Sequence, residues 1–383
     1  MDNEIQQLIQ AIHDNPARIV FVTAGAGTGA LADLLGVAGA TRTLLEALVP
    51  YSEASFDDFL GQKPCQYVAD ETGRLMAGRA YTRARWLADE GPLIGLACTA
   101  TIATDRLKRG EHRAHIAVWQ PARLVSYTLQ LAKGRRDRSG EEALVSRVIL
   151  NSLAVACGLE TQLPLSLTAG ESLTETVYDF AGLVARLQRG ELSYFGVHDN
   201  GRLRTTDAHP QVLLSGSFNP LHEGHLDLAR AAARVLGKPV AFELAARNAD
   251  KPPLPAPTVL YRLAQFAGRY PVYVSQAATF VEKAQIYPGV TFVMGYDTAV
   301  RLLQPRFYGH DPANLRAALA EIRAQGCRFL VAGRLNSDAQ YHPPDDLNPP
   351  PDYADLFLRI PPDQFRRDIS STELRQRGEK GSR

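Results

Sequence analysis

Short apolar runs alternate with amphipathic stretches through the second half of the chain. The runs that predict buried strands lie at residues 212–214, 240–244, 272–274, 290–294 and 329–331. The stretches with apolar residues at helical spacing lie at residues 226–236, 257–267 and 313–324. Strands that alternate with helices in this way predict a doubly wound parallel sheet, in which a ligand lies beyond the carboxyl ends of the strands.

The first half has the same mixed character. Helices are predicted at residues 5–13, 30–35 and 142–156, and strands at residues 18–22, 115–119 and 124–131. Residues 159–210 are interpreted as a connector, with a helix whose apolar stripe runs from Leu173 to Leu187 and a hairpin around the Asn200-Gly201 turn. The prediction is therefore two α/β domains, residues 1–158 and residues 211–383, joined by this connector.

Composition narrows the class of protein. Of the 383 residues, 45% are hydrophobic and 22% are charged, which is typical of a soluble globular protein. The formal net charge of +1 gives no overall attraction for nucleic acid or an anionic membrane, so neither is expected as a partner. No apolar run reaches the ~18 residues of a membrane span and no apolar leader is seen, so the cytoplasm is the expected location. The four cysteines (Cys65, Cys98, Cys157 and Cys327) lack metal-ligand spacing and are expected to be buried reduced thiols.

The candidate chemistry begins where the strand at 212–214 ends. A loop of small and turn-forming residues follows, and a helical pattern then opens near His222 and His225. A strand, a tight loop and a helix N-terminus together bind phosphate, because unpaired backbone N–H groups and the helix dipole point at one place. Gly216 and Gly224 allow the backbone to approach a ligand closely. The two histidines face the same way if the helix begins near His222, and they add hydrogen-bond donors for a polyphosphate.

This loop and a second segment carry a family resemblance. Residues 216–225 match every fixed position of a Gly-x-Phe-x-Pro-x-His-x-Gly-His pattern, and residues 369–375 read Ile-Ser-Ser-Thr-Glu-Leu-Arg. In this order the two patterns resemble the nucleotidyltransferase superfamily that contains the nicotinamide and nicotinate mononucleotide adenylyltransferases. The resemblance extends over about residues 205–383. It implies a Rossmann-like domain that transfers AMP from ATP to such a mononucleotide, with release of pyrophosphate.

The resemblance also implies roles for individual residues. The catalytic candidates, which would hold the triphosphate and stabilise its developing charge, are His222, His225 and Arg375. The nucleotide-binding candidates are Gly216, Ser217, Phe218, Gly224, Gly295, Asp297, Ser370, Ser371 and Thr372. The candidates for binding a phosphorylated small-molecule acceptor are Asn248, Lys251 and Arg334. Mg²⁺ is expected to arrive with the ATP, and no metal ligand is expected from the protein.

Simpler roles exist for several of these residues. Asp297 and the Ser-Ser-Thr segment could be helix N-caps, and Lys251 and Arg334 could be exposed loop cations. The Pro- and Asp-rich insert at residues 336–352 matches no part of the family pattern.

The N-terminal half carries a second resemblance. Glycines at positions 25, 27 and 29 follow the strand at 18–22 but do not meet the G-x-G-x-x-G pattern of dinucleotide-binding loops. Together with residues 37–41 and Tyr51-Ser52, this loop resembles the C-terminal domain of the competence-damage-inducible CinA proteins, over about residues 1–158. Active members of that family hydrolyse the amide of nicotinamide mononucleotide with a loop serine, and Ala24 stands at that position. Because Ala24 has no hydroxyl, we expect a catalytically degenerate α/β/α domain that serves structural support, dimerisation or ligand sensing.

Three alternative functions stay open. The C-terminal domain could be a cytidylyltransferase, or an adenylyltransferase for a different phosphorylated acceptor. The chain could instead be a non-catalytic nucleotide sensor, since one half lacks its catalytic serine. The N-terminal domain could still hydrolyse an amide, and Thr99, which the family also has, would then be required. Any homo-oligomer is expected to form through the N-terminal domain.

Overall fold

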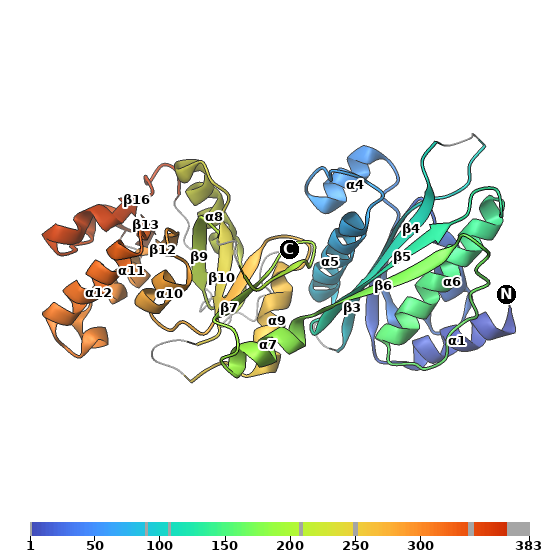
Figure 1. Cartoon of the computed structure of the whole chain (residues 1–383), viewed down its shortest axis with the longest axis horizontal. Coiled ribbons are helices and arrows are strands. Elements are labelled where there is room, and N and C mark those ends of the chain that lie inside the picture. Colours follow the sequence, from blue (N-terminus) through green and yellow to red (C-terminus); the bar gives the residue numbers. More distant parts are fainter. Residues whose placement is uncertain are drawn as a thin grey trace.

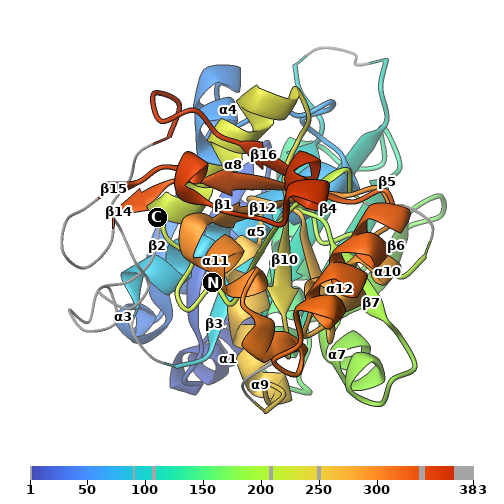
Figure 2. The ribbon, with the colours of Figure 1, turned by 90° about the vertical axis from the view of Figure 1, so that its left-hand side faces the viewer.

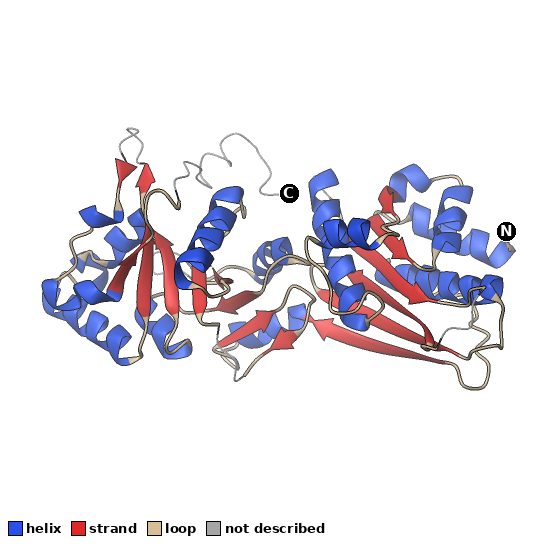
Figure 3. Ribbon diagram, turned by 90° about the horizontal axis from the view of Figure 1, so that it is seen from above, coloured by secondary structure: helices blue, strands red, loops and turns tan. Residues whose placement is uncertain are grey.

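The computed structural model describes residues 2–88, 91–105, 109–206, 210–247, 252–335 and 341–365. Two lobes lie side by side along the longest axis of the molecule (Figure 1). Each lobe is built around one large sheet flanked by helices (Figure 3). The prediction of two α/β domains is therefore confirmed. Within the described part of the chain, no helix has the length and apolar character needed to cross a membrane.

The N-terminal sheet has six strands in the order β2-β1-β3-β4-β5-β6. They are β1 (Arg18–Ala24), β2 (Leu44–Leu48), β3 (Leu93–Thr101), β4 (His112–Trp119), β5 (Arg123–Leu131) and β6 (Ser172–Asp179). The helices are α1 (Asn3–Asp14), α2 (Thr28–Gly36), α3 (Ala40–Thr43), α4 (Glu53–Leu60), α5 (Asp70–Leu87) and α6 (Arg138–Ala156). Strands β1, β2 and β3 are parallel, and the pairs from β3 to β6 are antiparallel. Helices α1, α2 and α6 share a core with one face of β1 and β3, whereas α5 covers the opposite face.

The connector contributes to both sheets. The helix predicted from Leu173 is wrong over its first half, because residues 172–179 form β6 and helix α7 (Phe180–Gln188) begins after them. The segment Ser-Leu-Thr-Glu-Thr-Val-Tyr-Asp contains three β-branched residues and a tyrosine, which favours a strand. Asp179 then caps α7 by accepting the backbone N–H of Gly182 at 2.8 Å. The predicted hairpin is confirmed as β7 (Tyr194–Val197) and β8 (Leu203–Arg204), and β7 pairs antiparallel with the C-terminal sheet.

The C-terminal sheet has the strand order β16-β13-β12-β9-β10-β11-β7-β8. The parallel strands are β9 (Val212–Gly216), β10 (Ala241–Ala245), β11 (Val272–Ser275), β12 (Thr291–Gly295), β13 (Arg328–Ala332) and β16 (Phe357–Arg359). The α-helices are α8 (Glu223–Leu236), α9 (Ala256–Leu263), α10 (Phe280–Ile286), α11 (Tyr296–Leu302) and α12 (Pro312–Ala324). The short elements are η1 (Ala264–Phe266), η2 (Pro305–Tyr308), β14 (Arg334–Leu335), β15 (Tyr341–His342), η3 (Pro344–Asp346) and η4 (Pro351–Leu356).

This strand order confirms the predicted doubly wound parallel sheet. Strands β10 and β12 lie on opposite sides of β9, so the direction of winding reverses next to β9. Helices α8 and α9 pack on one face of the sheet. Helices α10, α11 and α12 pack on the other face and lie in front of the sheet in Figure 2.

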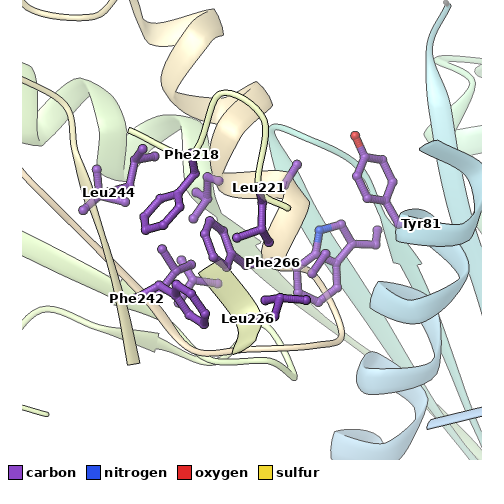
Figure 4. Close-up of a cluster of buried hydrophobic side chains, with 14 of the residues drawn as sticks. Tyr81, Phe218, Leu221, Leu226, Phe242, Leu244 and Phe266 are labelled. Carbon is purple, nitrogen blue, oxygen red and sulfur yellow. The ribbon is translucent and has the colours of Figure 1, made fainter. Parts of the chain in front are cut away.

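One apolar core runs through both lobes. It contains Tyr81 of α5, Trp119 of β4 and Phe180 of α7 together with Phe218 and Phe266 of the C-terminal domain. None of these side chains is more than 2% exposed. Figure 4 shows Tyr81 on α5 next to the C-terminal members of this cluster. Because each buried aromatic ring contributes about 1.5–3 kcal/mol, the domains are joined by core packing and not by the connector alone.

The cysteines are more exposed than predicted. All four are free, with Cys98 and Cys327 buried, Cys157 partly exposed and Cys65 exposed. Burial raises the pKa of the Cys98 thiol to about 12. The expectation of buried thiols is therefore wrong for Cys65.

The C-terminal domain contains a buried ion pair whose effect on the free energy of unfolding can be tested. The side chains of Glu243 on β10 and Lys283 on α10 are 0% and 6% exposed, and their charged atoms are 2.5 Å apart. Lys283→Met leaves this carboxylate buried without its cation, so we expect the free energy of unfolding to fall by about 3–5 kcal/mol. The double variant Glu243→Gln, Lys283→Met has no buried charge and should regain most of the loss. Denaturant unfolding of all three proteins measures the difference, and an equal loss in both variants would contradict the expectation.

Candidate functional site

The loop at residues 217–222 joins β9 to α8 at the carboxyl edge of the C-terminal sheet. It lies at the point where the winding of the sheet reverses, which is where such folds bind ligands. Helix α8 begins at Glu223 with His222 as its N-cap, so the N–H groups of its first turn open toward this edge. The predicted order of strand, tight loop and helix N-terminus is confirmed.

Phe218 anchors the loop in the core. Its ring makes edge contacts with the rings of Phe242, Phe266 and His225 at centroid distances of 5.5, 5.2 and 5.1 Å. Figure 4 shows Phe218 beside Phe242 and Phe266. Its φ of +43° is a left-handed conformation that costs a non-glycine residue about 1–3 kcal/mol, which burial of the ring offsets. A Cβ on Gly216 would lie 2.9 Å from this ring, so the loop's own packing requires glycine there. The side chain of Phe218 thus belongs to the core, and its backbone is the part left for a ligand.

The two histidines predicted to act together are stacked on each other. The ring centroids of His222 and His225 are 3.7 Å apart, with 29° between the ring planes. The backbone N–H of His222 donates to Nδ1 of His225 at 3.2 Å. The neutral imidazole of His225 therefore carries its proton on Nε2, which makes Nε2 a hydrogen-bond donor.

Burial keeps both imidazoles neutral. Burial, with a smaller contribution from the positive charge of Arg334, lowers the pKa of His222 to about 4. Burial also lowers the pKa of His225 to about 3, with a smaller contribution from His222. At neutral pH the pair is therefore uncharged and offers N–H donors without a fixed positive charge.

Asp297 and Arg334 are brought together beside this pair. Arg334 follows β13 and donates from Nη1 to Oδ2 of Asp297, which lies in the first turn of α11 after Gly295. The N-cap of α11 is Gly295, so the alternative reading of Asp297 as an N-cap is wrong. A Cβ added to Gly295 would meet no heavy atom within 4 Å among the described residues, so space is open above the end of β12.

Two residues that the sequence did not single out hold the loop in place. The amide of Gln265 donates to the carbonyl of Phe218 at 2.8 Å and accepts the N–H of Leu221 at 2.9 Å. Arg262 donates to the carbonyl of Ser217 at 3.1 Å. Both lie inside a predicted helix with no motif around them, so no sequence signal marked them.

Part of the insert also reaches this edge. The hairpin of β14 and β15 follows β13, and the ring of His342 on β15 stacks on Tyr296 with centroids 5.3 Å apart and planes at 9°. Asp346 lies 3.4 Å from Nδ1 of His342. The sequence assigned no place to this insert, and the structure sets its described part over the start of α11.

Several candidates lie outside the described residues. They are Asn248, Lys251, Ser370, Ser371, Thr372 and Arg375. Their roles stay predictions, as does the convergence of His225 and Arg375 on one polyphosphate. Ser217 is exposed and Gly224 is buried in the first turn of α8.

In the N-terminal domain, the corresponding loop between β1 and α2 is already filled by the protein. The carboxylate of Glu142 on α6 accepts the N–H of Gly27 at 2.9 and 3.0 Å and the N–H of Gly29 at 2.9 Å. A negative group therefore already occupies the position at the helix N-terminus that a phosphate would take. This arrangement agrees with the absence of a dinucleotide-binding pattern in the sequence.

The position of the missing serine lies in a surface pocket. Its lining includes Ala24, Tyr51, Phe56, Tyr67 and Thr99. The hydroxyl of Thr99 donates to the carbonyl of Tyr67 at 2.8 Å, so its proton is already engaged. Thr23, one residue before Ala24, likewise donates to the backbone, at the carbonyl of Ala26. Both hydroxyl protons are therefore engaged by backbone carbonyls, and the expected loss of catalysis in this domain stays a prediction.

The comparison with family models agrees with the resemblance of the C-terminal half. Residues 213–377 match the sequence model of the family described as cytidylyltransferase-like. Similar solved structures include the competence/damage-inducible protein CihA of Agrobacterium tumefaciens, at 18% identity and a TM-score of 0.34, covering 41% of this chain and 97% of that one. CinA-superfamily proteins of Klebsiella pneumoniae and Escherichia coli align at 13% and 15% identity with TM-scores of 0.33 and 0.32, each covering 40% of this chain and 96% and 88% of theirs. No curated protein matches the chain.

The reversal-point loop and the family match together define a nucleotidyltransferase domain in the C-terminal half. The family that residues 213–377 match is the cytidylyltransferase-like family, and the resemblance found in the two motifs is confirmed.

The low pKa values of the two histidines predict how stability depends on pH. Above pH 6.5 both imidazoles are neutral in the folded and in the unfolded chain, so the two histidines do not lower the free energy of unfolding there. Between pH 6.5 and about 4 for His222, or about 3 for His225, the unfolded chain binds protons that the folded chain does not, so stability falls as pH falls. Imidazole NMR titration, assigned with His222→Asn and His225→Asn, measures the pKa values directly. Midpoints near 6.5 for both residues would contradict the prediction.

Proposed function

We propose that the C-terminal domain transfers AMP from ATP to a phosphorylated mononucleotide, with nicotinamide or nicotinate mononucleotide as the first candidates, and releases pyrophosphate. The observation that carries the proposal is the stacked, neutral pair of His222 and His225 at the N-terminus of α8. The pair lies at the reversal point of a parallel sheet and close to Arg334. We place this reaction in the cytoplasm, where ATP is supplied.

The proposed mechanism relies on position and charge. The acceptor phosphate attacks the α-phosphorus of ATP in line with the leaving pyrophosphate, so no covalent intermediate with the protein is needed. Nε2–H of His225 and the imidazole of His222 donate to the triphosphate as negative charge builds on it. The backbone of Ser217 and Phe218 and the first turn of α8, which includes Gly224, supply further N–H donors. The glycine at 216 lets the loop keep this shape.

The second motif completes the triphosphate site in this proposal. The hydroxyls and N–H groups of Ser370, Ser371 and Thr372 would bind the β- and γ-phosphates, and Arg375 would add a fixed cation. Mg²⁺ would enter with the triphosphate, because the phosphate oxygens are its main ligands.

In this proposal the phosphorylated acceptor binds at the Arg334–Asp297 ion pair and above the end of β12. Arg334 would bind the acceptor phosphate, and Asp297 would accept hydrogen bonds from ribose hydroxyls above Gly295. Asn248 and Lys251 would contribute from the loop after β10. In this scheme the ligand separates or bridges the Arg334–Asp297 ion pair. Both side chains are about half-exposed, so breaking the pair costs little free energy.

CTP is the second candidate for the donor, because the matching family is described as cytidylyltransferase-like. The sensor hypothesis predicts nucleotide binding without turnover. Amide hydrolysis by the N-terminal domain is disfavoured by Ala24 and by the engaged hydroxyl of Thr99.

Pyrophosphate release tests the proposal. The purified full chain, Mg²⁺, ATP or CTP and a panel of mononucleotides should give pyrophosphate and the matching dinucleotide, identified by mass. His222→Asn and His225→Asn should each lower kcat by roughly 10²–10³, because each removes a donor to the charged transition state.

A surface histidine provides the matched control. His310 is exposed and has φ +60°, a conformation that Asn tolerates, so His310→Asn should leave kcat unchanged. Nucleotide binding with no pyrophosphate from any acceptor would favour the sensor, and no binding of either nucleotide would overturn the proposal.

A further inference from the structure

Two side chains of one short segment of the C-terminal domain bond to the main chain of the loop at residues 217–222. Gln265 fixes Phe218 and Leu221 through their backbone groups, and Arg262 fixes the carbonyl of Ser217. These bonds are made to the main chain, so they set the path of the loop rather than the identity of its side chains. The segment at residues 261–268 therefore helps to fix the main chain of the first motif, together with the buried ring of Phe218.

The same segment also packs directly against α5 of the N-terminal domain. A Cβ on Gly78 would lie 2.4 Å from the backbone N of Gly268, and a Cβ on Gly268 would lie 2.2 Å from the backbone N of Arg79. The two main chains are thus in direct contact. Because no rotamer change can relieve a backbone contact, a shift of α5 must move the segment with it.

Side chains along α5 extend this contact in both directions. Toward its C-terminal end, Arg85 donates to the carbonyl of Tyr261 at 3.2 Å and lies 4.2 Å from the centroid of its ring. Toward its N-terminal end, the buried Arg74 donates to the carbonyl of Asn200 at 3.0 Å. The neighbouring Asp199 accepts the N–H of Gly268 at 2.9 Å. Tyr81, between these ends, enters the core that also contains Phe218 and Phe266.

The start of α5 adjoins the pocket around Ala24. Tyr67 and Val68, which line that pocket, are followed by the N-cap Ala69 and then by the first residue of the helix, Asp70. A continuous packed path therefore runs from the pocket, along α5, across Gly78 and Gly268, to Gln265 and the loop.

We propose that α5 is a positioning element of the nucleotidyltransferase site, acting through the Gly78–Gly268 contact and through Gln265 as the positioning residue. In this role the N-terminal domain is a working part of the transferase even though it has lost its own serine. The inference rests on the proposed function only in that the positioned loop binds a nucleotide.

The test combines kinetics with amide hydrogen exchange of the loop in the full chain. Gln265→Leu removes both bonds to the loop, so the KM for the nucleotide should rise about tenfold with a smaller change in kcat, because ground-state and transition-state phosphates lose binding alike. Gln265→Glu keeps an acceptor for Leu221 and should fall between wild type and Gln265→Leu. Gly78→Ala, which lies in the other domain, should raise KM and speed exchange of the Leu221 amide in the same way.

The double variant separates positioning from general damage. If Gly78 acts through Gln265, Gly78→Ala with Gln265→Leu should raise KM no further than Gln265→Leu alone. Gln276→Leu is the matched control, because it breaks a 2.9 Å bond to the carbonyl of Leu187 that does not involve the loop. Gly110→Ala controls for glycine replacement, because the added Cβ would meet no heavy atom within 4 Å among the described residues beyond its chain neighbours.

Each outcome decides the inference. Unchanged KM and unchanged loop exchange in a folded Gly78→Ala protein would overturn it, as would fully multiplicative effects in the double variant. If Gly78→Ala does not fold, Arg85→Ala removes the contact between α5 and Tyr261 together with the interaction of Arg85 with Tyr81, and the same readouts apply. Failure of the proposed function is distinct, since wild type would then release no pyrophosphate, with or without nucleotide binding, while the exchange comparison of the loop would still be measurable.

Discussion

The burial of one aromatic ring underlies the geometry of the candidate site. Phe218 is held in a left-handed backbone conformation because its ring is enclosed by Phe242, Phe266 and the edge of His225. With the ring fixed, the chain folds over Gly216 and enters α8 with His222 as N-cap. The stacking of the two imidazoles, their burial and their low pKa values all follow from that entry angle. The catalytic proposal therefore depends on core packing as much as on the histidines themselves.

The chain contains two strand–loop–helix units of the same general kind, and different groups of the protein bond to the loops of the two units. In the N-terminal unit, Glu142 supplies the negative charge that the helix N-terminus attracts. In the C-terminal unit, the amide of Gln265 and the guanidinium of Arg262 bond to the main chain of the loop. The first helix N-terminus therefore holds a carboxylate of its own chain, whereas the second loop is held by an amide and a cation.

Periodicity and motif spacing predicted the parallel sheet, its order of elements and the histidine pair, because each depends on residues close together in the sequence. The strand β6 was missed because its apolar positions also fit one face of a helix that truly begins at Phe180. Gln265 and Glu142 were missed for a different reason, since each acts on a backbone group distant in sequence, 44 residues from Leu221 and 115 from Gly27. The pairing of Asp297 with Arg334 was likewise invisible, although each had been named separately. Long-range hydrogen bonds to the main chain leave no local pattern to read.

The continuity of the apolar interior constrains how this protein can change over time. Residues such as Tyr81 and Phe266 are packed in one cluster although they belong to different domains. A chimera that joined either half to an unrelated domain would keep only that half's residues of the shared core, and the new partner would not be complementary to them. Because the two domains share one core, a substitution in one half must be accommodated by packing changes in the other, as within any single folded domain.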